Sequence, residues 1–186
     1  MGNRKHVLCL LLLLGSAVAG RAQQWALSTN VADYANYATF NLEGSVATGQ
    51  HWSVTAVAKY NPFLYHREDG QPLSARQQVY GAGIRYWPWH VYSGWWTGLR
   101  AQYQEYNRGG IDSPVTDEGD RVGLGLSGGY SYMLTPHWNL DFGIGFWGGY
   151  DRFVTYSCPV CGVTQQRGER FFFLPNDVLL SLVYIF

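Results

Sequence analysis

Alternation with a period of two is the feature that most restricts the fold of this chain. In residues 138–151, bulky apolar side chains fall on one face, and Asn, Asp and Gly fall on the other. Residues 121–134 repeat the pattern, and Trp147 is the one bulky residue on the small face. Because successive side chains of a strand point to opposite faces, the pattern predicts strands with one apolar and one small, polar face.

Six further segments can be interpreted in the same way: 24–32, 37–47, 51–60, 78–87, 94–106 and 172–186. Three connections are short and turn-like: 48–50, 88–90 and 135–137. Three others are long and polar, 61–77, 107–120 and 157–170, while the first connection at that end, 33–36, is short. Eight strands with short turns at one end predict an all-β, eight-stranded antiparallel up-and-down β-barrel.

The composition favours a barrel that lies in lipid. Aromatic residues make up 17% of the chain and charged residues only 14%, against about a quarter charged in soluble domains. A membrane requires every backbone group to be paired between strands. We therefore expect a transmembrane barrel with a filled polar lumen, embedded in the lipid of a Gram-negative outer membrane. The alternative is a soluble, lipocalin-like barrel, in which the apolar face of residues 138–150 would point inward.

The N-terminal segment predicts export. Arg4 and Lys5 precede an apolar run and then small residues that end at Ala22. This is typical of a signal peptide at residues 1–22, followed by a barrel domain at residues 23–186. The remaining chain has ten basic and thirteen acidic side chains. Without a basic surplus, nucleic acid is not an expected partner.

The final strand predicts a role in assembly. Alternate residues from Val178 onward are apolar and end with Tyr184 and Phe186. C-terminal strands of this kind in outer-membrane proteins are recognised by the barrel-assembly machinery. We therefore expect Tyr184 and Phe186 to form the assembly signal, and that machinery to be a partner during biogenesis.

The alternation also predicts a charged lumen. Its inward-pointing residues are Glu43, Lys59, Arg85, Arg100, Asp141 and Asp177. Three acids and three bases can form a balanced network, and an eight-stranded barrel is just wide enough for its own side chains to fill. We favour this interpretation over the alternative, an ion or proton pathway.

Cys158 and Cys161 form a Cys-Pro-Val-Cys segment in the last predicted loop. A local disulfide is the favoured interpretation in an oxidising compartment. Half of a zinc site is the alternative, but the chain has no second cysteine pair to complete it. No metal and no cofactor are therefore expected.

His51 and Ser53 form the pattern that most resembles a catalytic pair. A His–Ser pair can cleave a lipid ester, but this pair lies beside a short turn, away from the expected outer leaflet. The aromatic residues near strand ends, which include Trp52, Trp87 and Tyr103, are typical of membrane-interface girdles rather than of a ligand site. We therefore expect no catalytic residues and no enzymatic activity.

Several short motifs, taken in order, resemble a known family. They are Asn61-Pro62-Phe63, residues 83–87 (GIRYW), residues 129–132 (GYSY), residues 137–140 (HWNL), residues 158–162 (CPVCG) and Tyr184-Ile185-Phe186. The chain is similar over nearly all of residues 23–186 to an uncharacterised Bacteroidota group of outer-membrane barrels, catalogued only as a domain of unknown function. The resemblance implies an outer-membrane location. Some members accompany genes for surface fimbriae, which implies an accessory role in a surface assembly.

These observations together predict a non-enzymatic barrel with a structural or surface-binding role. Three outer loops on a rigid scaffold would contact a surface protein partner. A narrow pore or transporter for a small solute is the alternative function, and a lipid-modifying hydrolase is a weaker one.

Overall fold

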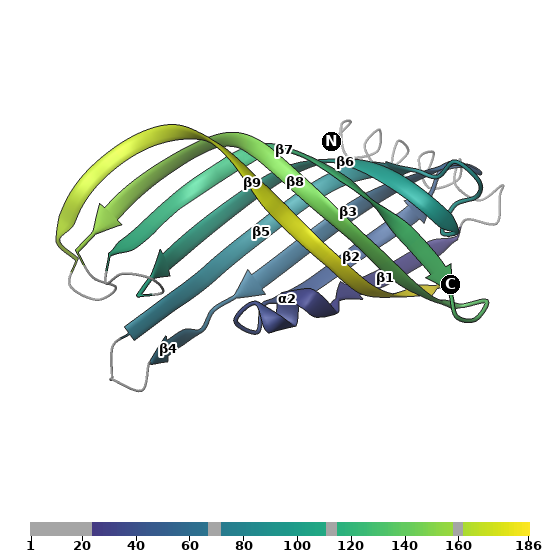
Figure 1. The fold of residues 1–186 in the computed structure, drawn as a ribbon, viewed down its shortest axis with the longest axis horizontal. Helices are drawn as coiled ribbons and strands as arrows, with labels where there is room; N and C mark the ends of the chain where they lie inside the picture. The colour runs from purple at the N-terminus through teal and green to yellow at the C-terminus, as the bar shows by residue number, and fades with distance from the viewer. Residues whose placement is uncertain (1–23, 67–71, 111–114, 158–161) are drawn as a thin grey trace, which may run out of the picture.

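The structure, a computed structural model, describes residues 24–66, 72–110, 115–157 and 162–186, which form one closed antiparallel sheet (Figure 1). The elements are β1 (Trp25–Asn30), α2 (Val31–Ala35), β2 (Phe40–Ala47), β3 (Trp52–Asn61), β4 (Leu64–His66), β5 (Pro72–Tyr86), β6 (Gly94–Gly109), β7 (Thr116–Met133), β8 (Trp138–Tyr156) and β9 (Thr164–Ile185). Neighbouring strands pair in chain order, β3 pairs directly with β5, and β1 pairs with β9 to close the ring. The short β4 pairs with β5. The described residues thus confirm the eight-stranded up-and-down barrel.

The barrel has its polar side chains inside and its apolar side chains outside. In β3, alternate residues from Ser53 to Asn61 are buried, whereas those from Trp52 to Tyr60 are exposed. The apolar face of β8 is also exposed, as Ile144 shows with 59% of its surface accessible. The lipocalin-like alternative required this face to point inward, and it points outward.

The short connections lie together at one end of the barrel. Residues 48–51, 87–93 and 134–137 join consecutive strands there. β1 begins and β9 ends at the same end, where the Phe186 amide donates a hydrogen bond to the Trp25 carbonyl oxygen over 2.8 Å. We refer to this as the turn end and to the opposite end as the rim. The three predicted turns are confirmed.

The rim differs from the prediction, because much of each predicted long loop is strand. β5 begins at Pro72, β6 continues to Gly109, β7 begins at Thr116 and β9 begins at Thr164. The extensions of β6, β7 and β9 are mostly polar on both faces, so the contrast between apolar and polar faces that reveals a strand is lost there. Backbone pairing continues regardless, for example where Asn107 of β6 lies opposite Glu118 of β7.

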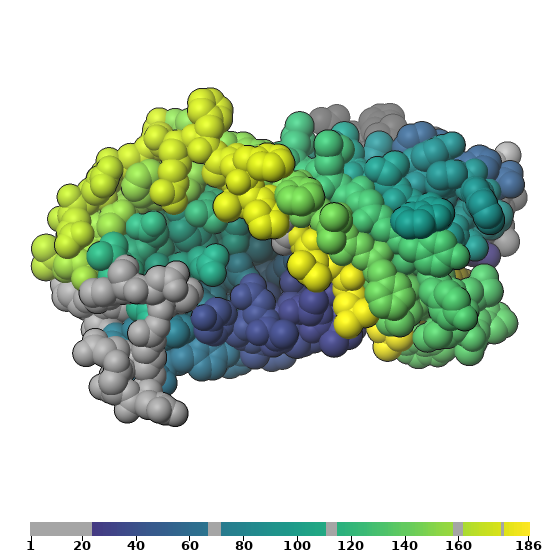
Figure 2. All heavy atoms as spheres, viewed as in Figure 1, coloured from purple at the N-terminus to yellow at the C-terminus, as the bar shows by residue number. Residues whose placement is uncertain are grey.

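The rim is also uneven. β1 stops at Asn30, and β2 begins only at Phe40. Helix α2 fills part of the interval, whereas β5 to β9 continue past it as a tall curved wall (Figure 1). Between β9 and α2, the space-filling view shows a hollow that leads towards the strands behind it (Figure 2).

Candidate functional site

A chain of buried ion pairs crosses the middle of the lumen. The six lumen charges expected from the sequence come from six strands and are all inside: Glu43 (β2), Lys59 (β3), Arg85 (β5), Arg100 (β6), Asp141 (β8) and Asp177 (β9). Their side chains are at most 11% exposed. We refer to these six residues as the lumen network.

Arg100 is at the centre of the lumen network. Its Nη1 lies 3.0 Å from Asp177 Oδ2, and its Nη2 lies 2.8 Å from Glu43 Oε2. Asp177 also contacts Lys59 Nζ at 2.6 Å, and Glu43 contacts Arg85 at 2.5 Å. Each of these carboxylates therefore bridges two cations, and strands far apart in the chain are joined through the lumen.

Asp141 ends the lumen network toward the turn end. Its Oδ2 lies 3.4 Å from Arg85 Nη1, and its Oδ1 accepts a hydrogen bond from Ser131 Oγ over 2.5 Å. Asn139 Nδ2 donates to the same Ser131 oxygen over 3.1 Å. A charged and polar cross-section therefore fills the lumen, and this favours its interpretation as an internal filling.

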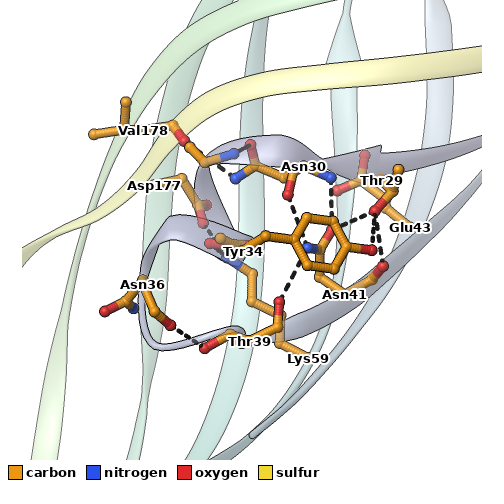
Figure 3. Close-up of polar contacts among 12 residues, drawn as sticks. Thr29, Asn30, Tyr34, Asn36, Thr39, Asn41, Glu43, Lys59, Asp177 and Val178 are labelled. Atoms are coloured by element: carbon orange, nitrogen blue, oxygen red, sulfur yellow. Dashed lines mark hydrogen bonds and ion pairs between the residues drawn. The ribbon is translucent and has the colours of Figure 1, made fainter. Parts of the chain in front are cut away.

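Helix α2 adds an acid that alternation could not place. Asp33 Oδ2 lies 3.0 Å from Lys59 Nζ, so Lys59 contacts two carboxylates, Asp33 and Asp177. Figure 3 shows Lys59 and Asp177 beside the helix. Burial raises the pKa of the Asp33 carboxyl, although the Lys59 ammonium acts in the opposite direction. Because Asp33 belongs to a short helix, its contact with the lumen depends on how that helix is held.

Asn30 holds α2 against the barrel. Its Oδ1 accepts a hydrogen bond from the Ala32 amide over 3.2 Å, which caps the first turn of the helix. The same oxygen accepts from the Leu180 amide over 3.0 Å, and Nδ2 donates to the Val178 carbonyl oxygen over 3.1 Å. The contact with Val178 is visible in Figure 3. One buried side chain thus joins the helix to β9 where β1 ends.

An apolar cluster fills the lumen at the turn end. Trp87 is fully buried and packs with Tyr92 and Trp96 at ring-centroid distances of 5.7 and 6.2 Å. The connection after β5 folds back inside, with Tyr92 in the left-handed region at a φ of 63°. The girdle position expected for Trp87 is therefore wrong, and the lumen is polar in its middle but apolar at this end.

Glycines on β7 and β8 make room for the Trp96 ring. A Cβ atom on Gly129 would lie 2.8 Å from Trp96 Cζ2 and 2.1 Å from the Phe142 carbonyl oxygen. A Cβ atom on Gly143 would lie 3.2 Å from the same ring carbon. The strand face with small side chains, from which the strands were predicted, therefore also accommodates the Trp96 indole.

A second ionic cluster, near the rim, was missed from the sequence. Asp151 is fully buried and accepts hydrogen bonds from Tyr106 Oη and Arg170 Nε, each over 2.9 Å. Arg121 Nε lies 3.3 Å from the same carboxylate. Burial raises the pKa of Tyr106 to about 12. Asp151 and Arg121 are on the predicted inward face, so alternation could have revealed this pair. Arg170 was assigned to a loop.

His51 and Ser53 both contact Trp87. His51 Nδ1 is 2.9 Å from the Trp87 carbonyl oxygen, and Ser53 Oγ accepts a hydrogen bond from the Trp87 indole over 3.0 Å. Ser53 is 1% exposed. A nucleophile must reach its substrate, so these contacts favour a structural role for both residues.

The remaining expected site residues are two cysteines and two C-terminal aromatic residues. Cys158 and Cys161 fall outside the described residues. At the turn end, the Tyr184 ring packs against Trp138 and Phe186, with both centroid distances at 4.9 Å. In the part of the chain that the structure describes, no three His, Cys, Asp or Glu side chains are grouped as metal ligands. A search of the same residues finds no helix that is long and apolar enough to span a membrane.

Comparison with known proteins identifies one family. A family model described as "Protein of unknown function (DUF3575)" matches residues 7–186. No curated protein matches the chain. No solved structure matches it.

Proposed function

Because the chain belongs to the DUF3575 family of proteins of unknown function, we propose its function from the geometry of the barrel. It is a non-enzymatic integral protein of a Gram-negative outer membrane, and its lumen does not let solutes pass through. The rim faces the cell exterior and binds a surface partner. The observation that carries this proposal is an exposed apolar band between two aromatic rings, outside a lumen filled by ion pairs.

The first aromatic ring surrounds the turn end. Its exposed members are Trp25, Trp52, Tyr86, Trp95, Tyr130, Trp138 and Phe186. The second ring includes Phe40, Tyr60, Tyr80, Tyr103 and Phe171. Between the rings, the outward side chains of β3 are Val54, Ala56 and Ala58. This arrangement is the one that lipid interfaces favour, with aromatic residues at both boundaries of an apolar band.

The spacing of the rings also supports a membrane position. Trp52 and Tyr60 are eight residues apart on β3, a distance of about 26 Å along a strand. A strand tilt of about 40° reduces the height of the band to about 20 Å, close to the typical value of about 25 Å. Charged outward side chains such as Glu105 and Arg152 lie beyond the second ring, on the rim.

A closed lumen is supported by its two fillings. The lumen network spans the middle, and the apolar cluster around Trp87 occupies the turn end. An ion would have to separate buried pairs in order to pass, which is costly. This disfavours the pore alternative.

The rim supports a binding role. β5 to β9 extend past the second ring as a polar wall that other molecules can reach. A paired wall is more rigid than the loops expected from the sequence, so less conformational entropy is lost when a partner binds. An accessory role in a surface assembly such as fimbriae fits this geometry.

The test combines membrane fractionation with gel mobility. We expect the chain to sediment with outer membranes and to migrate differently before and after boiling, because a closed barrel resists detergent until it is heated. In planar bilayers we expect no steady conductance. A soluble periplasmic protein whose mobility does not change on boiling would refute the membrane proposal. Stable ion-conducting events would refute the closed lumen.

A further inference from the structure

A cavity of about 130 Å³ lies in the lumen between the lumen network and the rim. Its polar lining includes Lys59, Gln77, Gln102, Gln104, Arg108 and Arg121. These side chains come from β3, β5, β6 and β7. Three cations line this cavity, and no carboxylate residue is among its lining residues. We refer to it as the vestibule.

The nearby acids leave donor capacity on these cations. Lys59 contacts Asp33 and Asp177, and an ammonium has three N–H donors, so one remains for the vestibule. Arg121 shares Asp151 with Arg170. Asp117, opposite Arg108 in the β6–β7 register, lies 3.9 Å from Arg170 and is the other nearby acid. The lining itself carries three positive charges and no negative one.

Arg121 and Arg108 contribute in different ways. Arg121 is buried, and its Nε makes no hydrogen bond to any described residue. Its guanidinium is held over the Tyr106 ring, 3.9 Å from the centroid, and lies 5.5 Å from the Phe172 centroid. Arg108 is exposed and forms no ion pair with any carboxylate that the structure describes. One cation is thus fixed in place, and the other is free to approach an incoming anion.

Amide groups complete the polar lining. Gln104 Nε2 donates a hydrogen bond to Gln77 Oε1 over 2.9 Å, and Gln77 Nε2 donates to Thr39 Oγ1 over 3.2 Å. This amide pair is positioned before any ligand arrives. Such preorganisation reduces the entropy lost on binding.

We propose that the vestibule binds one small oxyanion, the phosphate or carboxylate group of a ligand that enters from the rim. Guanidinium and ammonium groups form short, charge-assisted hydrogen bonds with these groups. The volume corresponds to about four water molecules, so it fits such a group rather than a whole sugar or peptide. The inference goes beyond the proposed function and rests on it only for the side from which the ligand arrives.

The experiment measures phosphate binding to the full chain. The barrel is folded in an uncharged, phosphate-free detergent at low salt, and inorganic phosphate is titrated by calorimetry. We expect one site, and we expect affinity to fall at least about tenfold in both Arg108→Gln and Arg121→Gln, because each removes a charge-assisted donor. Arg152→Gln is the matched control, since Arg152 is an exposed rim arginine that does not line the vestibule.

The outcomes distinguish a headgroup from a free anion as the source of the oxyanion. They also test the vestibule independently of the proposed function. Tighter binding of glycerol phosphate than of inorganic phosphate indicates a lipid or glycan headgroup, and equal or weaker binding indicates the free anion. No saturable binding by the wild-type barrel, or an equal loss in Arg152→Gln, overturns the site. Arg108→Gln changes an exposed side chain, so it tests the site even if Arg121→Gln does not fold. Heat-shifted mobility verifies each variant's fold. Membrane fractionation tests the proposed function separately.

Discussion

Replacing Arg100 with Met tests whether the lumen network stabilises the barrel. The change removes contacts with both Asp177 and Glu43 while it keeps an unbranched side chain in place of the aliphatic stem of arginine. Both carboxylates stay buried, each with one of its two cations lost. The lumen network together with Asp33 then has four acids and two bases.

The magnitude follows from comparison with an exposed pair of the same length. Arg100 Nη1 and Asp177 Oδ2 are 3.0 Å apart, with side chains 9% and 2% exposed. Arg152 Nε and Glu169 Oε1 are also 3.0 Å apart, but their side chains are 71% and 52% exposed. Loss of one partner from a buried pair costs about 3–5 kcal/mol. Loss of a surface pair costs about 0–1 kcal/mol.

The assay is reversible urea unfolding in lipid vesicles, followed by tryptophan fluorescence and gel mobility. We expect Arg100→Met to lower the free energy of unfolding by several kcal/mol and Arg152→Met to change it little. Equal effects in the two variants would refute the reasoning, since burial would then not increase the cost of breaking the pair.

Three other variants test separate features. Gly129→Ala should lower the free energy of unfolding by about 1–3 kcal/mol, because its Cβ would clash with Trp96. Gly44→Ala has nothing within 4 Å of its Cβ and should change the free energy little. Urea unfolding at neutral pH compares the two variants. A tyrosine in the unfolded chain ionises near pH 10, but the pKa of folded Tyr106 is raised to about 12. Between these values the folded state binds one more proton than the unfolded state, so the free energy of unfolding should fall as the pH rises. Tyr106→Phe should flatten that fall, and an unchanged slope would contradict the assignment. Asn30→Ala removes a helix cap worth about 1 kcal/mol as well as two contacts with β9, and faster hydrogen exchange at the Leu180 amide should report the loss.

Much of the barrel could be predicted because alternation depends only on side-chain direction. The six residues of the lumen network were found in this way. Their pairing could not be found, since it depends on strand register and on how the ring closes. Glu43 of β2 meets Arg85 and Arg100 because their long side chains reach into the lumen from the neighbouring strands β5 and β6.

The missed features have specific physical causes. Trp87 was placed in a girdle because it is aromatic and near a strand end, although it follows the outward Tyr86 by one residue and so points inward. Arg170 was assigned to a loop, because a strand that is polar on both faces has no alternation to reveal it. Asp33 reaches the lumen from a helix, where a period of two does not apply.

The uneven rim determines where the ring is easiest to open. β1 pairs with β9 only from Ala26 to Asn30, whereas β7 pairs with β8 from Thr116 to Met133. β1 pairs with β2 only from Trp25 to Ser28, so both seams of β1 are short. Thermal opening should begin at β1, because fewer backbone hydrogen bonds must break there. The seam between β1 and β9 joins the first strand to the last, and its backbone hydrogen bonds can form only after the last strand is in place. The final step of biogenesis would then be the closing of one of these two short seams, which the hydrogen bonds of Asn30 with β9 help to hold.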